Sequence, residues 1–195
     1  MNKDFVEAEI NVLETFAKKG ESYTNENGSY GWRNPIRHDT GRILQALVIT
    51  RKPKRILEIG TAHGLSALYL CSGLDSKSNA CLDSIEFDSD VASDTEQRFK
   101  KLNVPARVIT GDALKVIETL NEFYDMVFFD AQKSHYYDQL CLLLEKGIIG
   151  QGTIIIADNV IDREDECRPF LDWFIKNNIL YTIISTECGL LVAHL

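Results

Sequence analysis

The chain has 195 residues, 45% of them hydrophobic and 26% charged, which suits one globular domain with a proper core. Its formal net charge of −8 argues against the general basic face that nucleic-acid binding normally requires. No apolar run approaches the roughly 18 residues that a membrane-spanning helix needs.

The cysteines and the N-terminal residues indicate a compartment. Cys71, Cys81, Cys141, Cys167 and Cys188 are odd in number and include no C-x-x-C pair. Such a pattern favours reduced thiols over a disulfide framework. The N-terminal residues contain early acids and no apolar segment of the kind that signal peptides carry. We therefore expect a cytoplasmic protein.

In chain order, hydrophobic spacing first predicts an amphipathic helix over 5–17, then a polar flap with aromatic residues over 21–34. Asp39 or Thr40 is expected to cap a helix that stops before Pro53. Strands and helices alternate from residue 55 onward. Strands are predicted at 55–59, 80–87, 106–110, 124–129, 153–157, 179–186 and 190–194. Helices are predicted at 65–73, 89–102, 113–120, 136–145 and 164–177.

This alternation predicts a doubly wound α/β domain with a mostly parallel sheet, closed by a C-terminal antiparallel hairpin. No linker-like change in composition divides the chain. We therefore expect a single domain over 1–195, with an N-terminal helix and flap over 1–39 and a core over 40–195.

Two polar clusters come directly after apolar β runs: Asp130 with Lys133, and Asp158 with Asn159. Because parallel strands bring their C-terminal ends to one edge of a sheet, these side chains should converge there. Carboxylate and amide oxygens suit a hard divalent cation, and a nearby amine suits proton transfer. Taken singly, the first cluster could be a surface ion pair and the second a turn. Occurring together behind two apolar strands, they favour a site.

The ends of the first three core strands carry a second set of signals. Gly60 and Gly64 form a G-x-x-x-G turn, which differs from the G-x-G-x-x-G of dinucleotide folds. Glu58 adds negative charge there, which favours a ligand with an ammonium group. Glu86 could accept the hydroxyls of a ribose or be a solvated acid. Asp112 could bind an adenine amino group, cap a helix, or do both.

Several segments carry a family resemblance. They are R-I-L-E-I-G-T-A-H-G-L-S at 55–66, I-E-F-D at 85–88, G-D-A at 111–113, Y-D-M-V-F-F-D-A-Q-K at 124–133 and G-T-I-I-I-A-D-N-V at 152–160. In these segments, within roughly 40–160, the chain resembles class I S-adenosylmethionine-dependent methyltransferases. More narrowly, it resembles the catechol O-methyltransferase-like family of divalent-metal-dependent O-methyltransferases.

The resemblance implies a seven-stranded, mostly parallel Rossmann-like sheet and a set of site residues. It implies Asp130, Asp158 and Asn159 as ligands of Mg²⁺, or of another divalent cation such as Mn²⁺ or Ca²⁺. Lys133 would be the catalytic residue beside the reacting hydroxyl, where like-charge repulsion from the cation and the sulfonium eases loss of its proton. The residues implied around S-adenosylmethionine are Glu58, Gly60, Thr61, Ala62, Ser66, Glu86, Asp112, Ala113 and Asp130.

The expected function is O-methylation of a small catechol-like molecule that binds through two neighbouring hydroxyls. One alternative is O-methylation of a hydroxylated tRNA nucleoside, which the acidic net charge weakly disfavours. Another is a non-catalytic cofactor-binding module, against which the complete set of acids, amide and lysine argues. The identity of the acceptor, the choice between monomer and homodimer, and the role of the flap at 23–38 stay open at this stage.

Overall fold

The computed structural model describes residues 1–19, 23–25, 28–30 and 35–195. Helix α1 (Lys3–Lys19) opens the chain, and strands β1 (Tyr23–Asn25) and β2 (Gly28–Tyr30) form a small antiparallel pair. Of the predicted flap, 21–22, 26–27 and 31–34 lie outside the described residues, as does residue 20. The N-terminal helix is confirmed.

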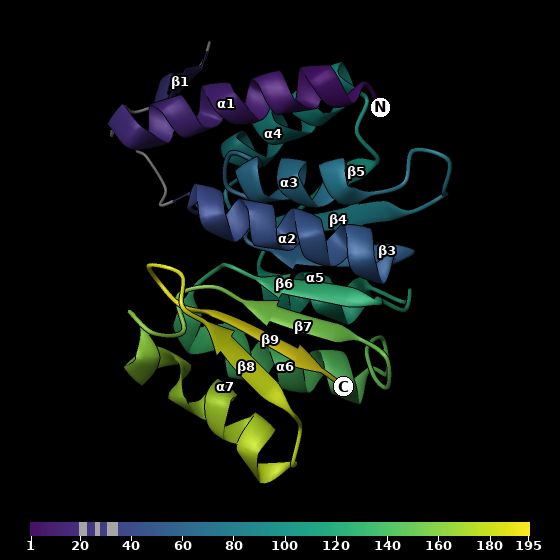
Figure 1. The fold of residues 1–195 in the computed structure, drawn as a ribbon, viewed down its shortest axis with the longest axis vertical. Coiled ribbons are helices and arrows are strands. Elements are labelled where there is room, and N and C mark those ends of the chain that lie inside the picture. Colours follow the sequence, from purple (N-terminus) through teal and green to yellow (C-terminus); the bar gives the residue numbers. More distant parts are fainter. Residues whose placement is uncertain (20–22, 26–27, 31–34) are drawn as a thin grey trace.

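The central sheet has seven strands in the order β5-β4-β3-β6-β7-β9-β8 (Figure 1). They are β3 (Arg55–Ile59), β4 (Cys81–Glu86), β5 (Ala106–Thr110), β6 (Met126–Phe129), β7 (Ile154–Ala157), β8 (Tyr181–Ile184) and β9 (Leu190–His194). Strands β3 to β7 are parallel, whereas β9 pairs antiparallel with both β7 and β8. The predicted doubly wound sheet with a C-terminal antiparallel hairpin is confirmed.

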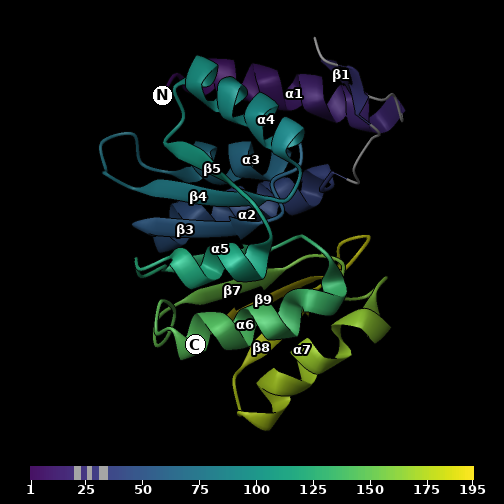
Figure 2. The same ribbon diagram turned by 180° about the vertical axis from the view of Figure 1, so that it is seen from behind.

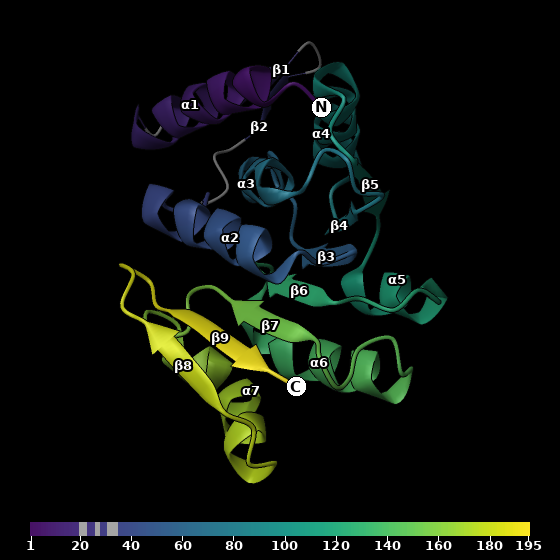
Figure 3. The ribbon, with the colours of Figure 1, turned by 45° about the vertical axis from the view of Figure 1, so that its right-hand side comes forward.

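Helices cover both faces of the sheet (Figures 1 and 2). They are α2 (His38–Arg51), α3 (Leu65–Gly73), α4 (Ser89–Leu102), α5 (Ala113–Thr119), the short 3₁₀ helix η1 (Lys133–His135), α6 (Tyr136–Glu145) and α7 (Glu164–Lys176). Side chains alternate along each strand, so Met126 and Phe128 of β6 pack in the core under α1, α2 and α3, whereas Val127 and Phe129 pack under α5, α6 and α7. Figure 3 shows these two layers from the side. None of the helices in the described ranges has the length and apolar character that crossing a bilayer requires.

The predicted N-terminal cap of α2, Asp39 or Thr40, is wrong by two or three residues. The helix begins at His38, and the capping position is Arg37, which has an extended backbone and makes no side-chain cap hydrogen bond. Gly41 N donates to Arg37 O at 2.9 Å, which starts the helix there. Asp39 lies in the first turn instead. The predicted stop before Pro53 is confirmed, since Lys52 ends the helix in the left-handed conformation.

Three helices meet at a buried tyrosine. The hydroxyl of Tyr69, on α3, donates to Glu14 of α1 and contacts Nδ1 of His38, on α2, at 3.1 Å. Gly41 lets α2 approach the Tyr69 ring, because a Cβ at position 41 would lie 2.3 Å from ring atom Cε2. The hydrogen bonds hold the ring where it cannot yield to a larger side chain.

We expect Gly41→Ala to lower the free energy of unfolding by about 1–3 kcal/mol, because the added methyl overpacks the junction between α2 and α3. Urea unfolding measures this. Gly150→Ala is the matched control, since a Cβ there meets nothing nearer than Phe123 Cε2 at 4.0 Å. Equal effects from the two substitutions would contradict the prediction.

Candidate functional site

Strand pairing brings the two acidic clusters together. Phe129 of β6 lies opposite Ala157 of β7, so the next residues, Asp130 and Asp158, leave neighbouring strands at the same level. Asp158 N donates to Phe129 O at 3.1 Å, which continues the ladder to that point. Adjacent strands lie about 4.8 Å apart, so the two acids start from neighbouring backbone positions.

The turn that follows β3, which begins at Gly60, lies at the same edge of the sheet. Asp130 N donates to Ile59 O at 2.9 Å, so β3 also ends beside Asp130. Gly60 follows with φ +104, and a Cβ there would lie 2.6 Å from Asp130 O. Only glycine allows both this backbone angle and this close approach. The turn after β3 is thereby held against the first of the two acids.

The carboxyl group of Asp158 is buried and that of Asp130 is 12% exposed, and their charges interact. Burial raises the pKa of Asp130; the ammonium of Lys133 opposes this, and Asp158 adds to it. Lys133 Nζ donates to Asp130 Oδ1 at 3.2 Å. Burial likewise raises the pKa of Asp158, whereas the backbone amide of Asn159 and the charge of Lys133 lower it. Such perturbed carboxyl groups are typical of functional sites.

The donor set fits a divalent cation. Oδ1 of Asp158 is buried and has no hydrogen-bond partner within the described part of the chain. Asn159, with φ 65, follows in the left-handed conformation that asparagine tolerates. Two carboxylates and an amide oxygen are ligands that Mg²⁺ accepts. No cluster of three or more His, Cys, Asp or Glu side chains that could hold a metal occurs in the ranges that the structure describes; Asn159, as an amide, falls outside these residue types.

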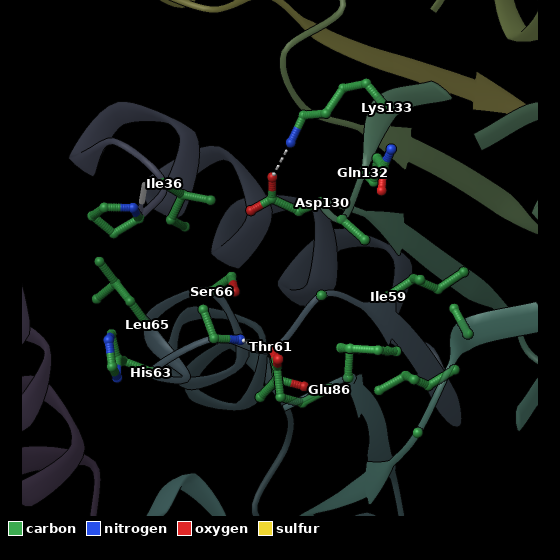
Figure 4. Close-up of a pocket in the computed structure, with 18 of the residues that line it drawn as sticks. Ile36, Ile59, Thr61, His63, Leu65, Ser66, Glu86, Asp130, Gln132 and Lys133 are labelled. Carbon is green, nitrogen blue, oxygen red and sulfur yellow. Dashed lines mark hydrogen bonds and ion pairs between the residues drawn. The ribbon is translucent and has the colours of Figure 1, made fainter. Parts of the chain in front are cut away.

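A cavity of about 520 Å³ opens beside Asp130 (Figure 4). Figure 4 shows Lys133 reaching to Asp130 on one side, with Thr61 and Glu86 on the opposite side. The predicted site residues that line it are Gly60, Thr61, Ala62, Ser66, Glu86, Ala113, Asp130 and Lys133. The sequence therefore identified most of its polar lining.

Glu86 lies at the cavity wall and is only 5% exposed, so it is not a solvated acid. Its Oε2 accepts from Ala62 N at 2.8 Å and its Oε1 from Asp88 N at 3.0 Å. These amides orient the carboxylate at the end of β4. A carboxylate at a cavity wall is a suitable acceptor for hydroxyl groups of a ligand.

Two predicted cofactor residues do not line this cavity. Asp112 caps α5, where its Oδ1 accepts from Lys115 N at 3.2 Å, so the capping alternative is confirmed. Glu58 lies beneath the turn, fully buried. Its Oε2 accepts from Ser84, whereas its buried Oε1 has no hydrogen-bond partner in the described ranges. Burial raises the pKa of Glu58 to about 8, against the effect of the Ser66 and Ser84 hydroxyls.

A second cavity, of about 440 Å³, reaches the other predicted cation ligands. Asp158 and Asn159 line it, and it shares Pro35 and Ile36 with the first cavity. Its remaining lining residues are Glu14, Ala17, Arg37, His38, Asp162, Glu187 and Cys188. Asp130 thus lines one cavity and Asp158 the other, and the two cavities have Pro35 and Ile36 as common wall residues.

Sequence reasoning assigned no site role to two residues of this region. Tyr136 is fully buried, and its hydroxyl donates to Phe129 O at 2.9 Å, at the end of β6. Asp162 accepts from Asn159 Nδ2 at 3.3 Å. An acid three residues after Asn159 is a spacing that could have drawn attention to Asp162. No local pattern distinguishes Tyr136 from an ordinary core aromatic.

Comparison with known proteins finds a family match. A family model described as O-methyltransferase matches residues 17–170. Bovine catechol O-methyltransferase is 32% identical over 137 residues, which cover 67% of this chain and 50% of that protein. Catechol O-methyltransferase of Niastella koreensis is 33% identical over 129 residues, covering 62% and 56%. The matches thus span about half the length of these curated relatives.

Solved structures share the fold. An O-methyltransferase from Bacillus cereus in complex with SAH aligns with a TM-score of 0.78 and 24% identity, covering 100% of this chain and 92% of that one. An SAH-bound methyltransferase from Podospora anserina aligns with a TM-score of 0.70 and 26% identity, covering 82% and 79%.

The buried carboxyl of Glu58 should make stability depend on pH. Between pH 4.5 and about 8 the folded protein keeps a proton on Glu58 that the unfolded chain has released, so the free energy of unfolding falls as pH rises. The Glu58→Gln variant has no ionisable group at this position, so its free energy of unfolding does not decrease with pH for this reason. Between pH 5 and pH 9 the free energy of unfolding of the variant, relative to that of the natural chain, should therefore rise by about 3–5 kcal/mol.

Urea unfolding at pH 5, 7 and 9 measures this difference. Glu118→Gln, at an exposed position on α5, controls for loss of an ordinary surface charge. A difference between natural chain and Glu58→Gln that stays constant across this pH range would contradict the assignment.

Proposed function

Because the chain belongs to the O-methyltransferase family, we propose that it transfers the methyl group of S-adenosylmethionine to a hydroxyl of a small catechol-like molecule with two neighbouring hydroxyls. The observation that carries this proposal is the placement of Asp130 and Asp158, in register at adjacent strand ends, where Asp130 lines the first cavity and Asp158 the second. One cavity suits a cofactor and the other a small acceptor.

The first cavity is proposed to hold S-adenosylmethionine, which is the methyl donor in this chemistry. Glu86 would accept the ribose hydroxyls, since amides already orient its carboxylate at the cavity wall. The turn from Gly60 to Ser66 would lie along the methionine part, and Ser66 faces the cavity there. The cofactor-bound relative from Podospora anserina supports this choice.

Asp130, Asp158 and Asn159 are proposed to hold a divalent cation, most simply Mg²⁺. A cation bound to these ligands lowers the pKa of a hydroxyl that coordinates it. Burial prepares the two carboxyl groups for this role, because a cation offsets the cost of holding both ionised side by side.

Lys133 is proposed to accept the proton of the reacting hydroxyl. Its side chain is only 17% exposed, and its ion pair with Asp130 holds Nζ beside the proposed cation ligands. The deprotonated acceptor oxygen then forms a bond to the methyl carbon as the carbon–sulfur bond breaks. Holding the two partners aligned can supply roughly 7–11 kcal/mol of the rate enhancement.

We expect Asp158→Asn to lower turnover by about 100-fold or more, because it removes one charge from the cation ligands at nearly constant shape. Cofactor affinity should change little, since Asp158 lines the second cavity and not the first. Product formation from catechol and from total RNA is followed by mass spectrometry, and S-adenosylhomocysteine binding by calorimetry. Asp165→Asn, an exposed acid in the first turn of α7, is the control.

Removal of the cation by a chelator tests the proposed role of the metal directly. Treatment with EDTA should abolish methyl transfer, and added Mg²⁺ should restore it. Full activity of the chelated protein would exclude the cation from the proposed reaction while leaving the family assignment intact.

We expect Lys133→Met to lower kcat on catechol by about 10²–10⁴-fold, the range typical of a lost general base. A nitro-substituted catechol has a more acidic hydroxyl and needs less help in losing its proton, so the same variant should lose much less activity on it. Steady-state kinetics on both acceptors measures the ratio. An equal loss on the two acceptors would show that Lys133 acts in some other way.

A further inference from the structure

The contact between Asn159 and Asp162 fixes the direction of an amide. Asn159 Nδ2 donates to Asp162 Oδ2 at 3.3 Å. An ionised carboxylate only accepts hydrogen bonds, so the amide nitrogen must face Asp162 and the amide oxygen must lie on the other side of the group. Asp158, which precedes Asn159 in the chain, has a buried oxygen with no hydrogen-bond partner among the described residues.

The backbone that carries Asp162 is held by the turn between β8 and β9. Val160 N donates to Gly189 O at 3.1 Å, and the amides of Ile161 and Asp162 donate to Cys188 O at 2.9 and 3.3 Å. Gly189 packs so closely that a Cβ there would lie 2.3 Å from Ile161 Cγ1. The starting point of the Asp162 side chain is therefore set by tertiary contacts.

Asp162 also brings a further acid to the second cavity. Asp162 itself is exposed, and it lines the second cavity together with Asp158 and Asn159. A third acid near two buried ones is unfavourable unless a positive charge accompanies them.

We propose that Asp162 is a positioning residue of the cation site: it holds the nitrogen of the Asn159 side chain, so that the amide oxygen faces the cation held by Asp130 and Asp158. The inference rests on the proposed function, because it concerns the same cation. Partners that orient a metal ligand typically change metal affinity by 10–100-fold when they are lost.

The test is direct binding of Mn²⁺ to the full chain, measured by electron paramagnetic resonance. Asp162→Ala should weaken Mn²⁺ binding by about tenfold or more. Asp162→Asn keeps an oxygen that accepts from the amide and should weaken binding less. Asp165→Ala, which removes a nearby exposed acid, should stay within about twofold of the natural chain.

A second readout reports on the amide itself. The side-chain NH₂ signals of Asn159, assigned from their loss in Asn159→Asp, should shift in Asp162→Ala and stay in place in Asp165→Ala. Urea unfolding confirms that the variants fold, which is expected because Asp162 is exposed.

The outcomes separate the inference from the proposed function. If the natural chain binds no Mn²⁺, the cation itself is excluded, and this inference fails with it. If the natural chain binds Mn²⁺ and Asp162→Ala binds it equally well, only the role of Asp162 is overturned. If Asp162→Ala and Asp162→Asn are equally weakened and high salt removes both differences, Asp162 acts through its charge alone, and positioning is refuted.

Discussion

The parallel pairing of β6 between β3 and β7 is the constraint on which the candidate site depends. It sets Gly60, Asp130 and Asp158 at one level on three neighbouring strands. Side-chain direction alternates along a strand, so a register shift of one residue would turn Asp130 to the opposite face. The close approach of Gly60 to the Asp130 carbonyl leaves no room for such a shift. The hydrophobic cores on the two faces of the sheet therefore determine where the acids lie.

Two kinds of acid on this sheet differ in how their burial is compensated. Asp83, on β4, is also buried, and burial alone would raise its pKa, yet hydrogen bonds from Arg107 and Tyr124 lower the pKa below its usual value. Asp130 and Asp158 lie at the ends of strands of the same sheet, and their pKa values are raised. Removing a carboxylate from water costs several kcal/mol unless partners replace the solvent. Asp83 has its partners within the protein, whereas Asp158 has an oxygen that a ligand could satisfy.

Much of the fold and part of the candidate site could be predicted from sequence, for one physical reason: the deciding signals are local. An apolar run followed by Asp130 or Asp158 marks a strand and its end, and the strand order then places those ends together. What could not be predicted depends on contacts between distant segments. The complete burial of Glu58 depends on Ser84 of the neighbouring strand and on the turn after β3, which cover it. The start of α2 at His38 coincides with a 2.8 Å contact to Glu14 of another helix, which no capping pattern within α2 encodes.

The two cavities also differ in how much of each could be predicted from local sequence. Turns that follow consecutive strands build most of the first, so short motifs identify it, whereas distant segments build the second: α1, residues 35–38, the end of β7 and the β8–β9 turn. Across its rim, Arg37 Nη2 donates to Glu187 Oε1 at 2.7 Å, and both side chains are more than half exposed. An exposed pair of this kind contributes about 1 kcal/mol at most, so it can open at little cost. Substitutions at this rim would therefore change the shape of the second cavity without moving Asp130 and Asp158, because the strand register that places these acids does not depend on the rim.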